Sequence, residues 1–258
     1  MKIKQIRNAT ILVDYGTVRL LVDPMLGDKH AYPRLRLFKH RGRNPSIDLQ
    51  DGAQDSLEQA THCIITHFQK GHFDHLDKAA VRWLRARNLP VFCTPRDAEV
   101  LSHMGLKTTR FRHDLGEPQP FFNGKIRTTP CIHGRGIIGS LMEHGVGYFI
   151  ELPGEPSLFL TGDTVLTAEL RHFVEAQRPD VIVAPAGGAR FDVGGKIIMD
   201  DQDMVSLARL TSGAVVANHI GAISHCPVSR ADVTQTAARA GLADRISAPA
   251  DGEELEFS

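Results

Sequence analysis

Three histidines and two aspartates lie within one twelve-residue stretch of this chain, residues 66–77. The apolar residues 63–65 just before it are typical of a short buried strand, and apolar residues between 76 and 84 recur at helical spacing. The stretch is therefore predicted to be a turn that leaves a strand and enters a helix. Imidazole nitrogen and carboxylate oxygen, brought together on such a turn, suit zinc, manganese or iron.

A polar turn that merely happens to be rich in histidine and aspartate would look the same, so other strand ends decide between the two interpretations. His133, Asp163 and His219 each lie at or just past the end of a further predicted strand. Side chains at one edge of a sheet commonly build metal sites in layered α/β proteins. The candidate metal ligands are His67, His72, Asp74, His75, His133, Asp163 and His219.

Predicted strands alternate with predicted helices in each half of the chain, without an internal repeat of fixed period. The predicted strands are residues 3–6, 11–13, 18–22, 63–65, 90–93, 107–112, 125–132, 146–152, 157–160, 181–184 and 214–217. The predicted helices are residues 76–87, 96–104, 168–176, 200–210 and 229–240. This alternation indicates the α/β class.

Composition limits the kind of protein. With 258 residues, of which 42% are hydrophobic, the chain can bury a full core, and we expect a single domain over residues 1–258. Lys+Arg and Asp+Glu are both 30, so no overall charge recruits nucleic acid or an anionic membrane. The four cysteines are isolated, and neither a signal peptide nor a membrane span is apparent. We expect a cytoplasmic protein without a membrane or nucleic-acid partner; a homo-oligomer remains open.

Residues 29–47 form a basic segment without a single acidic residue, and prolines and glycine within it disfavour regular structure. One interpretation is a solvated basic loop inserted into the domain. The other is a lid in which Arg34, Arg36 and Arg41 bind a phosphate or carboxylate of the substrate, because guanidinium matches those anions with two hydrogen bonds.

The order of these motifs carries a resemblance. His-x-Asp-His at 72–75, a lone His133 before glycine, Thr-Gly-Asp at 161–163 and Asn-His at 218–219 together resemble the metallo-β-lactamase-fold hydrolases. Within them the chain looks most like the branch that includes L-ascorbate-6-phosphate lactonase, and the match in motif order runs from about 11 to 219. The resemblance implies a four-layer αββα sandwich with two metal ions, zinc or manganese, at one edge.

The resemblance also implies a role for each residue. His72 and His133 would hold the first metal, Asp163 would bridge the two, and the second metal would be held by Asp74, His75 and His219. Asp23, at the end of the strand 18–22, matches a family aspartate that orients the ligands from behind.

The chain departs from the family pattern His-x-His-x-Asp-His at one point. Four residues separate His67 from His72 where the family has one. A three-residue insertion would still return His67 to the first metal. Without that gap, Lys70 takes the expected place, and its ammonium would repel a cation.

The implied activity is hydrolysis of a small anionic ester or lactone by a metal-bound hydroxide, with Asp74 binding metal and guiding the proton of the attacking water. His225, six residues after His219, is a candidate substrate-binding or acid group, and equally a hydrogen-bonded loop histidine. Two alternatives remain: a phosphodiesterase or nuclease of the same fold, and an iron-dependent oxidoreductase or non-catalytic metal-binding protein on this scaffold.

Overall fold

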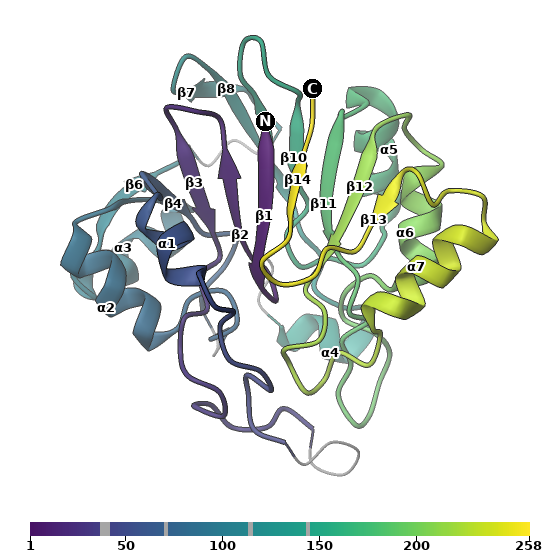
Figure 1. The fold of residues 1–258 in the computed structure, drawn as a ribbon, viewed down its shortest axis with the longest axis horizontal. Coiled ribbons are helices and arrows are strands. Elements are labelled where there is room, and N and C mark those ends of the chain that lie inside the picture. The colour runs from purple at the N-terminus through teal and green to yellow at the C-terminus, as the bar shows by residue number, and fades with distance from the viewer. Residues whose placement is uncertain (37–41, 70–71, 113–115, 143–144) are drawn as a thin grey trace.

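The computed structural model describes residues 1–36, 42–69, 72–112, 116–142 and 145–258 of the chain. Within these residues, two seven-stranded sheets face each other and helices cover both outer faces (Figure 1). The predicted αββα arrangement is confirmed. No helix in this part of the chain is long and apolar enough to cross a membrane.

The first sheet combines an antiparallel and a parallel half. Its strand order is β14-β1-β2-β3-β4-β5-β6. The strands are β1 (Lys2–Arg7), β2 (Thr10–Asp14), β3 (Arg19–Val22), β4 (His62–Ile64), β5 (Pro90–Cys93), β6 (Lys107–Arg110) and β14 (Glu254–Glu256). From β3 to β6 the strands are parallel, which requires crossover connections. Its helices are α1 (Ala53–Glu58), α2 (Lys78–Arg87) and α3 (Pro95–His103).

The second sheet is built in the same way, in the order β13-β12-β11-β10-β9-β8-β7. The strands are β7 (Gln119–Phe121), β8 (Gly124–Pro130), β9 (Val146–Glu151), β10 (Leu158–Leu160), β11 (Val181–Pro185), β12 (Ala214–Asn218) and β13 (Ile246–Ser247). The helices are α4 (Gly136–Leu141), α5 (Ala168–Gln177), α6 (Asp201–Ala208) and α7 (Arg230–Arg239). β8 ends at Pro130, two residues earlier than predicted, because proline lacks the N–H that a ladder needs.

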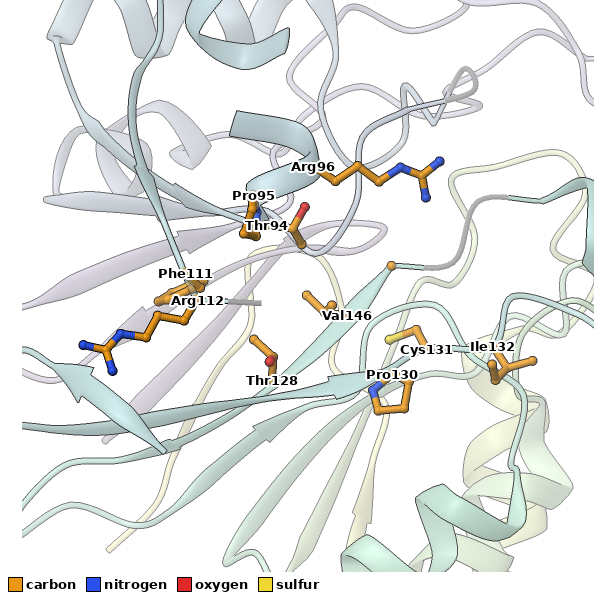
Figure 2. A pocket seen from close by; sticks show the side chains of 11 residues that line it. Thr94, Pro95, Arg96, Phe111, Arg112, Thr128, Pro130, Cys131, Ile132 and Val146 are labelled. Atoms are coloured by element: carbon orange, nitrogen blue, oxygen red, sulfur yellow. The ribbon is translucent and has the colours of Figure 1, made fainter. Parts of the chain in front are cut away.

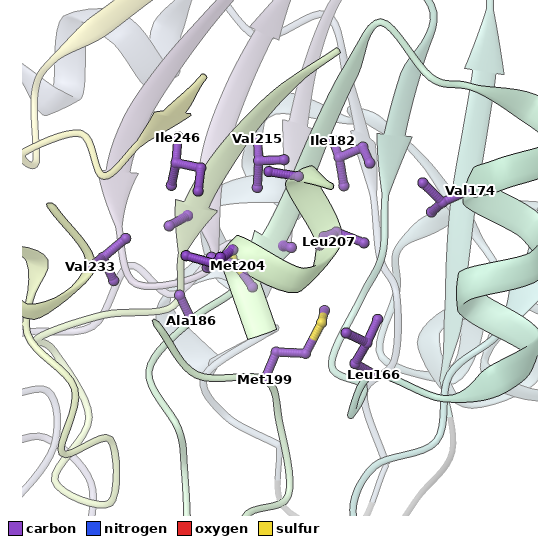
Figure 3. Close-up of a cluster of buried hydrophobic side chains, with 14 of the residues drawn as sticks. Leu166, Val174, Ile182, Ala186, Met199, Met204, Leu207, Val215, Val233 and Ile246 are labelled. Atoms are coloured by element: carbon purple, nitrogen blue, oxygen red, sulfur yellow. The ribbon is translucent and has the colours of Figure 1, made fainter. Parts of the chain in front are cut away.

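The alternation of side chains along the central strands divides the core into layers. Val181 and Val183 of β11 pack between the two sheets, whereas Ile182 and Ala184 of the same strand pack against the outer helices. Figure 3 shows this outer cluster, where Met204 and Leu207 of α6 face Ile182 and Val215 of the sheet. A strand buried on both faces has to be apolar throughout, which is why this run was recognisable in the sequence.

The short elements α1, α4, β7, β13 and β14 were not predicted. α4 contains two glycines in six residues, so its composition gives no helical signal. β14 pairs with β1, Lys2 opposite Glu256, and so joins the two ends of the chain in one sheet. Such pairing between distant segments leaves no local pattern to read.

Candidate metal centre

The candidate ligands follow the carboxyl ends of strands in both sheets. His67 lies three residues after β4, His133 three after β8, Asp163 three after β10, and His219 directly after β12. Because these ends meet at one edge of the sandwich, residues far apart in the sequence converge there. His72, Asp74 and His75 reach the same edge on the turn before α2. Asp77 ends that turn: its carboxylate caps the helix by accepting the Ala80 N–H at 2.7 Å.

The side chains form two adjacent clusters. The three-histidine cluster consists of His67, His72 and His133, and the mixed cluster consists of Asp74, His75, Asp163 and His219. Within each cluster, the atoms able to bind a metal lie within 4.8 Å of one another. All seven side chains are buried. His67 joins His72 despite the longer spacing between them, with ring centroids 4.4 Å apart.

Asp163 lies between the two clusters. Its Oδ2 is 3.1 Å from His75 Nε2 and 3.3 Å from His219 Nε2 in the mixed cluster. The same oxygen is 3.6 Å from His133 Nε2 in the three-histidine cluster. Asp74 contacts its own cluster, with Oδ2 3.2 Å from His219 Nε2. A single carboxylate therefore reaches both clusters.

All five imidazole rings are held through Nδ1. The contacts are His67 to Thr66 Oγ1 at 3.0 Å, His72 to the Gln69 carbonyl at 2.5 Å, His75 to Asp23 Oδ2 at 2.9 Å, His133 to the Ile197 carbonyl at 3.0 Å, and His219 to Cys226 Sγ at 3.5 Å. A carbonyl or carboxylate only accepts, so Nδ1 is the protonated nitrogen opposite those partners. In a neutral ring, Nε2 then keeps its lone pair, as metal-binding histidines require.

Asp23 orders two of these rings from behind. Its carboxylate accepts the Thr66 N–H at 2.8 Å, the Thr66 hydroxyl at 2.6 Å and the His75 Nδ1–H at 2.9 Å. Because the Thr66 hydroxyl donates to Asp23, its oxygen accepts from His67 Nδ1–H. His67 Nε2 is then an unprotonated atom. Among the residues that the structure describes, it is buried without a hydrogen-bond partner.

That buried lone pair, beside further imidazole and carboxylate donors, fits a divalent metal ion. A buried acceptor without a donor is costly unless something else binds it. Nitrogen and carboxylate oxygen in this mixture suit zinc, manganese or iron. The donor set of both clusters is therefore compatible with the metals that the sequence resemblance implied.

The two clusters differ in charge. In the mixed cluster, burial alone would lower the pKa of His75, but the carboxylates of Asp163, Asp23 and Asp74 raise it to about 10. The pKa of His219 is also raised, against the effect of burial and chiefly by Asp163. Burial favours a neutral Asp163, yet the His219 and His75 cations hold its pKa well below the ordinary value.

In the three-histidine cluster, His67 and His133 are neutral at physiological pH. Burial, reinforced by the neighbouring imidazoles His75 and His72, lowers the pKa of His67 well below its ordinary value. Burial lowers the pKa of His133 to about 4, although Asp163 acts in the opposite direction. The first cluster therefore offers unprotonated nitrogen, and the second offers carboxylates that are paired with protonated histidines.

His225 lies beside the mixed cluster and is 5% exposed. Its ring stacks on Phe191, with centroids 5.9 Å apart. Burial lowers its pKa to about 4, so the ring is neutral at physiological pH. Its Nδ1 has no hydrogen-bond partner among the described residues.

The basic segment contributes one buried arginine. Arg36 is 4% exposed, and its Nε lies 3.5 Å from Asp192 Oδ1. The neighbouring Leu35 N–H donates to Ser224 Oγ at 3.4 Å, so this segment is tied to two loops near the centre. Arg34 is exposed. Arg41 and Lys70 lie outside the described residues. Substrate binding by these arginines stays a prediction.

Two cavities adjoin the three-histidine cluster. One, of about 290 Å³, lies where β8 and β9 approach the start of α3, and the Arg96 and Arg112 side chains extend to opposite sides of it (Figure 2). A β-carbon on Gly145 in its wall would stand 2.8 Å from His67 Cβ, so the wall touches that histidine. The other, of about 490 Å³, has His72 itself in its wall. Sequence reasoning missed both cavities, although Phe68 and Phe73 stand out as apolar residues in a polar turn.

Comparison with known proteins identifies the family. A family model described as a beta-lactamase superfamily domain matches residues 2–219. The chain belongs to this superfamily. The UPF0173 protein YddR of Bacillus subtilis (strain 168) is 30% identical over 263 residues, which cover 100% of both chains. A UPF0173 metal-dependent hydrolase of Xanthobacter autotrophicus is 25% identical, covering 75% of this chain and 74% of that protein.

Solved structures of superfamily members share the fold. The crystal structure of an isothiocyanate hydrolase from Delia radicum gut bacteria has a TM-score of 0.88 and 28% identity, covering 100% of this chain and 99% of the other. Together with the relatives above, these matches make the chain a metal-dependent hydrolase of the metallo-β-lactamase fold. The L-ascorbate-6-phosphate lactonase branch stays a prediction.

Proposed function

We propose that the centre binds two divalent cations, zinc or manganese, and that the enzyme hydrolyses a small molecule at an electrophilic carbon. The three-histidine cluster would hold one cation, the other donors of the mixed cluster would hold the second, and Asp163 would be shared. The observation that supports this most is the buried lone pair of His67 Nε2 among six further donor side chains.

The bound cations would lower the pKa of a water molecule from about 16 to about 7 and polarise the substrate. Asp74 is ionised at neutral pH, because the His75 and His219 cations overcome burial and lower its pKa. Its carboxylate can therefore accept a hydrogen bond from the attacking water and orient it. His225 is neutral and has an unpartnered Nδ1, so it is suited to hydrogen-bond the substrate.

Two substrate classes are candidates. The resemblance of the sequence suggested a small anionic ester or lactone, and the similar gut-bacterial enzyme is named an isothiocyanate hydrolase. We favour the neutral isothiocyanate, because Arg36 is paired with Asp192 rather than open to an anion. Water would add to the isothiocyanate carbon, and the resulting thiocarbamic acid would split into an amine and carbonyl sulfide as its O–H proton moves to nitrogen.

The test is a substrate screen on protein purified without chelator, with its metal content measured in parallel. Methyl and benzyl isothiocyanate, a neutral ester, an anionic lactone and a phosphodiester cover the candidate classes. We expect isothiocyanate turnover that chelation removes and that Asp163→Asn lowers by orders of magnitude. Asp55→Asn, at an exposed aspartate on α1, is the matched control.

Three results would overturn the proposal. Turnover of none of these compounds would exclude a hydrolase of this substrate range. Preferential turnover of the phosphodiester would favour the phosphodiesterase class. Redox-active iron as the native metal would favour the oxidoreductase class.

A further inference from the structure

The cavity beside His72 is walled by aromatic and aliphatic side chains. Tyr32 and Phe73 stack face to face in its wall, with ring centroids 4.7 Å apart and an interplanar angle of 15°. Phe68 forms another part of the wall and packs against the core cluster beneath α2 and α3. Because Phe73 also packs against the buried Met25 and Ile223, the walls are set by the core.

The open side of this cavity is also apolar. Val100 of α3 is 42% exposed, and Met104, the C-cap residue of the same helix, is half-buried. An exposed valine on a cavity wall is a surface that a ligand can cover favourably. The cavity volume of about 490 Å³ lies within the range of about 300–1,000 Å³ typical of small-molecule sites.

Two polar side chains in the wall, Asp77 and Gln69, already have hydrogen-bond partners. The Asp77 carboxylate accepts the Gly27 N–H at 2.6 Å and also caps α2. The Gln69 amide donates to Asp97 Oδ1 at 3.0 Å and to the Arg96 carbonyl at 3.2 Å. Lys78 is exposed at the start of α2. The cavity therefore suits a neutral, apolar group better than a carboxylate or phosphate.

We infer that this cavity binds an apolar, ring-sized substituent of the substrate while the reactive carbon lies at the metal centre. His72 connects the two places, because its ring belongs to the three-histidine cluster and also lines the cavity. The inference rests on the proposed function and deepens it: the substrate carries an aryl or comparable apolar group. The cavity with Arg96 and Arg112 at its sides has none of the seven candidate ligands in its wall and is the competing location.

A binding experiment tests the cavity without turnover. The chain has six methionines, and Met104 is the one that lines this cavity. The 258-residue chain is labelled with ¹³C at the methionine methyl groups and titrated with benzyl alcohol as the probe. We expect a saturable shift of the Met104 resonance through the ring current of the probe, and loss of that shift in Val100→Asp. An unmoved Met104 signal, or a saturable shift of another methionine instead, would overturn the inference.

A kinetic experiment then tests the role in catalysis. Benzyl isothiocyanate should exceed methyl isothiocyanate in kcat/KM by about 10–100-fold, the range expected for added apolar groups in a fitted pocket. Val100→Asp should reduce this ratio at least tenfold, and the isosteric Val100→Thr should reduce it less. His103→Asp, on the same helix but outside the cavity wall, should keep the ratio.

The two failures are distinguishable. An unchanged ratio in Val100→Asp, with both compounds hydrolysed, would overturn the inference and leave the proposed function standing. Absence of hydrolysis with a saturable Met104 shift would overturn the proposed function and leave the apolar binding site standing.

Discussion

The three-histidine cluster and the mixed cluster lie side by side, yet their buried polar groups differ in charge. The mixed cluster pairs two carboxylates with two histidines whose pKa values are raised, so its charges balance internally. The three-histidine cluster has no carboxylate of its own, and burial keeps His67 and His133 neutral. Proximity therefore does not make the two halves of the centre equivalent.

This difference in charge predicts how tightly each cluster would bind a cation. The carboxylates of the mixed cluster attract a divalent ion strongly, but its histidines must first lose protons. In the three-histidine cluster, His67 and His133 carry no competing proton at neutral pH, and the cluster relies on the shared Asp163 for negative charge. We expect the mixed cluster to bind more tightly, increasingly so as the pH rises.

The largest loss of metal binding and activity is expected at Asp163, the residue that contacts both clusters. Asp163→Asn removes the charge that contacts both clusters, so both cations should bind more weakly and activity should fall by orders of magnitude. Metal content and turnover, measured on the same preparation, check this. Loss of metal from one cluster with the other intact would show that Asp163 serves only one of them.

Asp74→Asn and His67→Ala together test the asymmetry. Asp74→Asn keeps the size of the side chain but removes charge from the mixed cluster, so second-metal occupancy and activity should fall strongly in a folded protein. His67→Ala should be milder, because His72, His133 and Asp163 remain for the first metal. The comparison is wrong if His67→Ala proves the more damaging when metal content and turnover are measured side by side.

Asp23→Asn should have an intermediate effect on both clusters. Asp23 orients His75 directly and His67 through Thr66, and loss of such a partner typically lowers metal affinity or activity by about 10–100-fold. Metal-affinity titrations of the variant check this. Unchanged affinity at both clusters would show that the packing alone holds these rings.

The metal-free protein should show opposite pH responses from the two clusters. The pKa of His75 is raised in the folded state, so its stabilisation is full below about 6.5 and is lost as pH rises toward about 10. The pKa of His133 is lowered to about 4, so the folded state loses stability as pH falls from about 6.5 toward that value.

Thermal unfolding across pH, with and without metal, measures these responses. Without metal, stability should peak near pH 6.5 and fall on both sides, and His133→Gln should flatten the acid side. A peak that stays unchanged in this variant would contradict the assignment of the acid side to the three-histidine cluster.

The smallest effect is expected at Arg36, which lies outside both clusters. Arg36→Gln removes the charge that pairs with Asp192 across two loops, so stability should fall by about 1–3 kcal/mol while metal content stays constant. Chemical unfolding and metal analysis check this. Loss of metal would show that the basic segment supports the centre itself.

Much of the centre was predictable because its residues follow apolar strands. His133, Asp163 and His219 each stand just after a run that has to be buried, so their convergence at one edge follows from topology. That convergence needs only local patterns and the rule that strand ends meet at a common edge. The role of Asp23 came instead from the resemblance to a family aspartate at a strand end.

Other features depend on contacts between segments that the sequence does not bring together. Thr66 accepts from His67 because its own hydroxyl donates a hydrogen bond to Asp23, 43 residues earlier. Arg36 and Asp192 are 156 residues apart, and their pairing is the reason why we propose a neutral rather than an anionic substrate. Such side-chain choices depend on the finished packing and leave no periodicity in the sequence.

The most direct test of the account is the metal stoichiometry of the wild-type chain beside His219→Ala. Metal-free protein is titrated with zinc and with manganese, and bound metal is counted per chain. The account predicts two ions per wild-type chain, with the tighter one lost or strongly weakened in His219→Ala. A single tightly bound ion that survives His219→Ala unchanged would contradict the division into two metal-binding clusters.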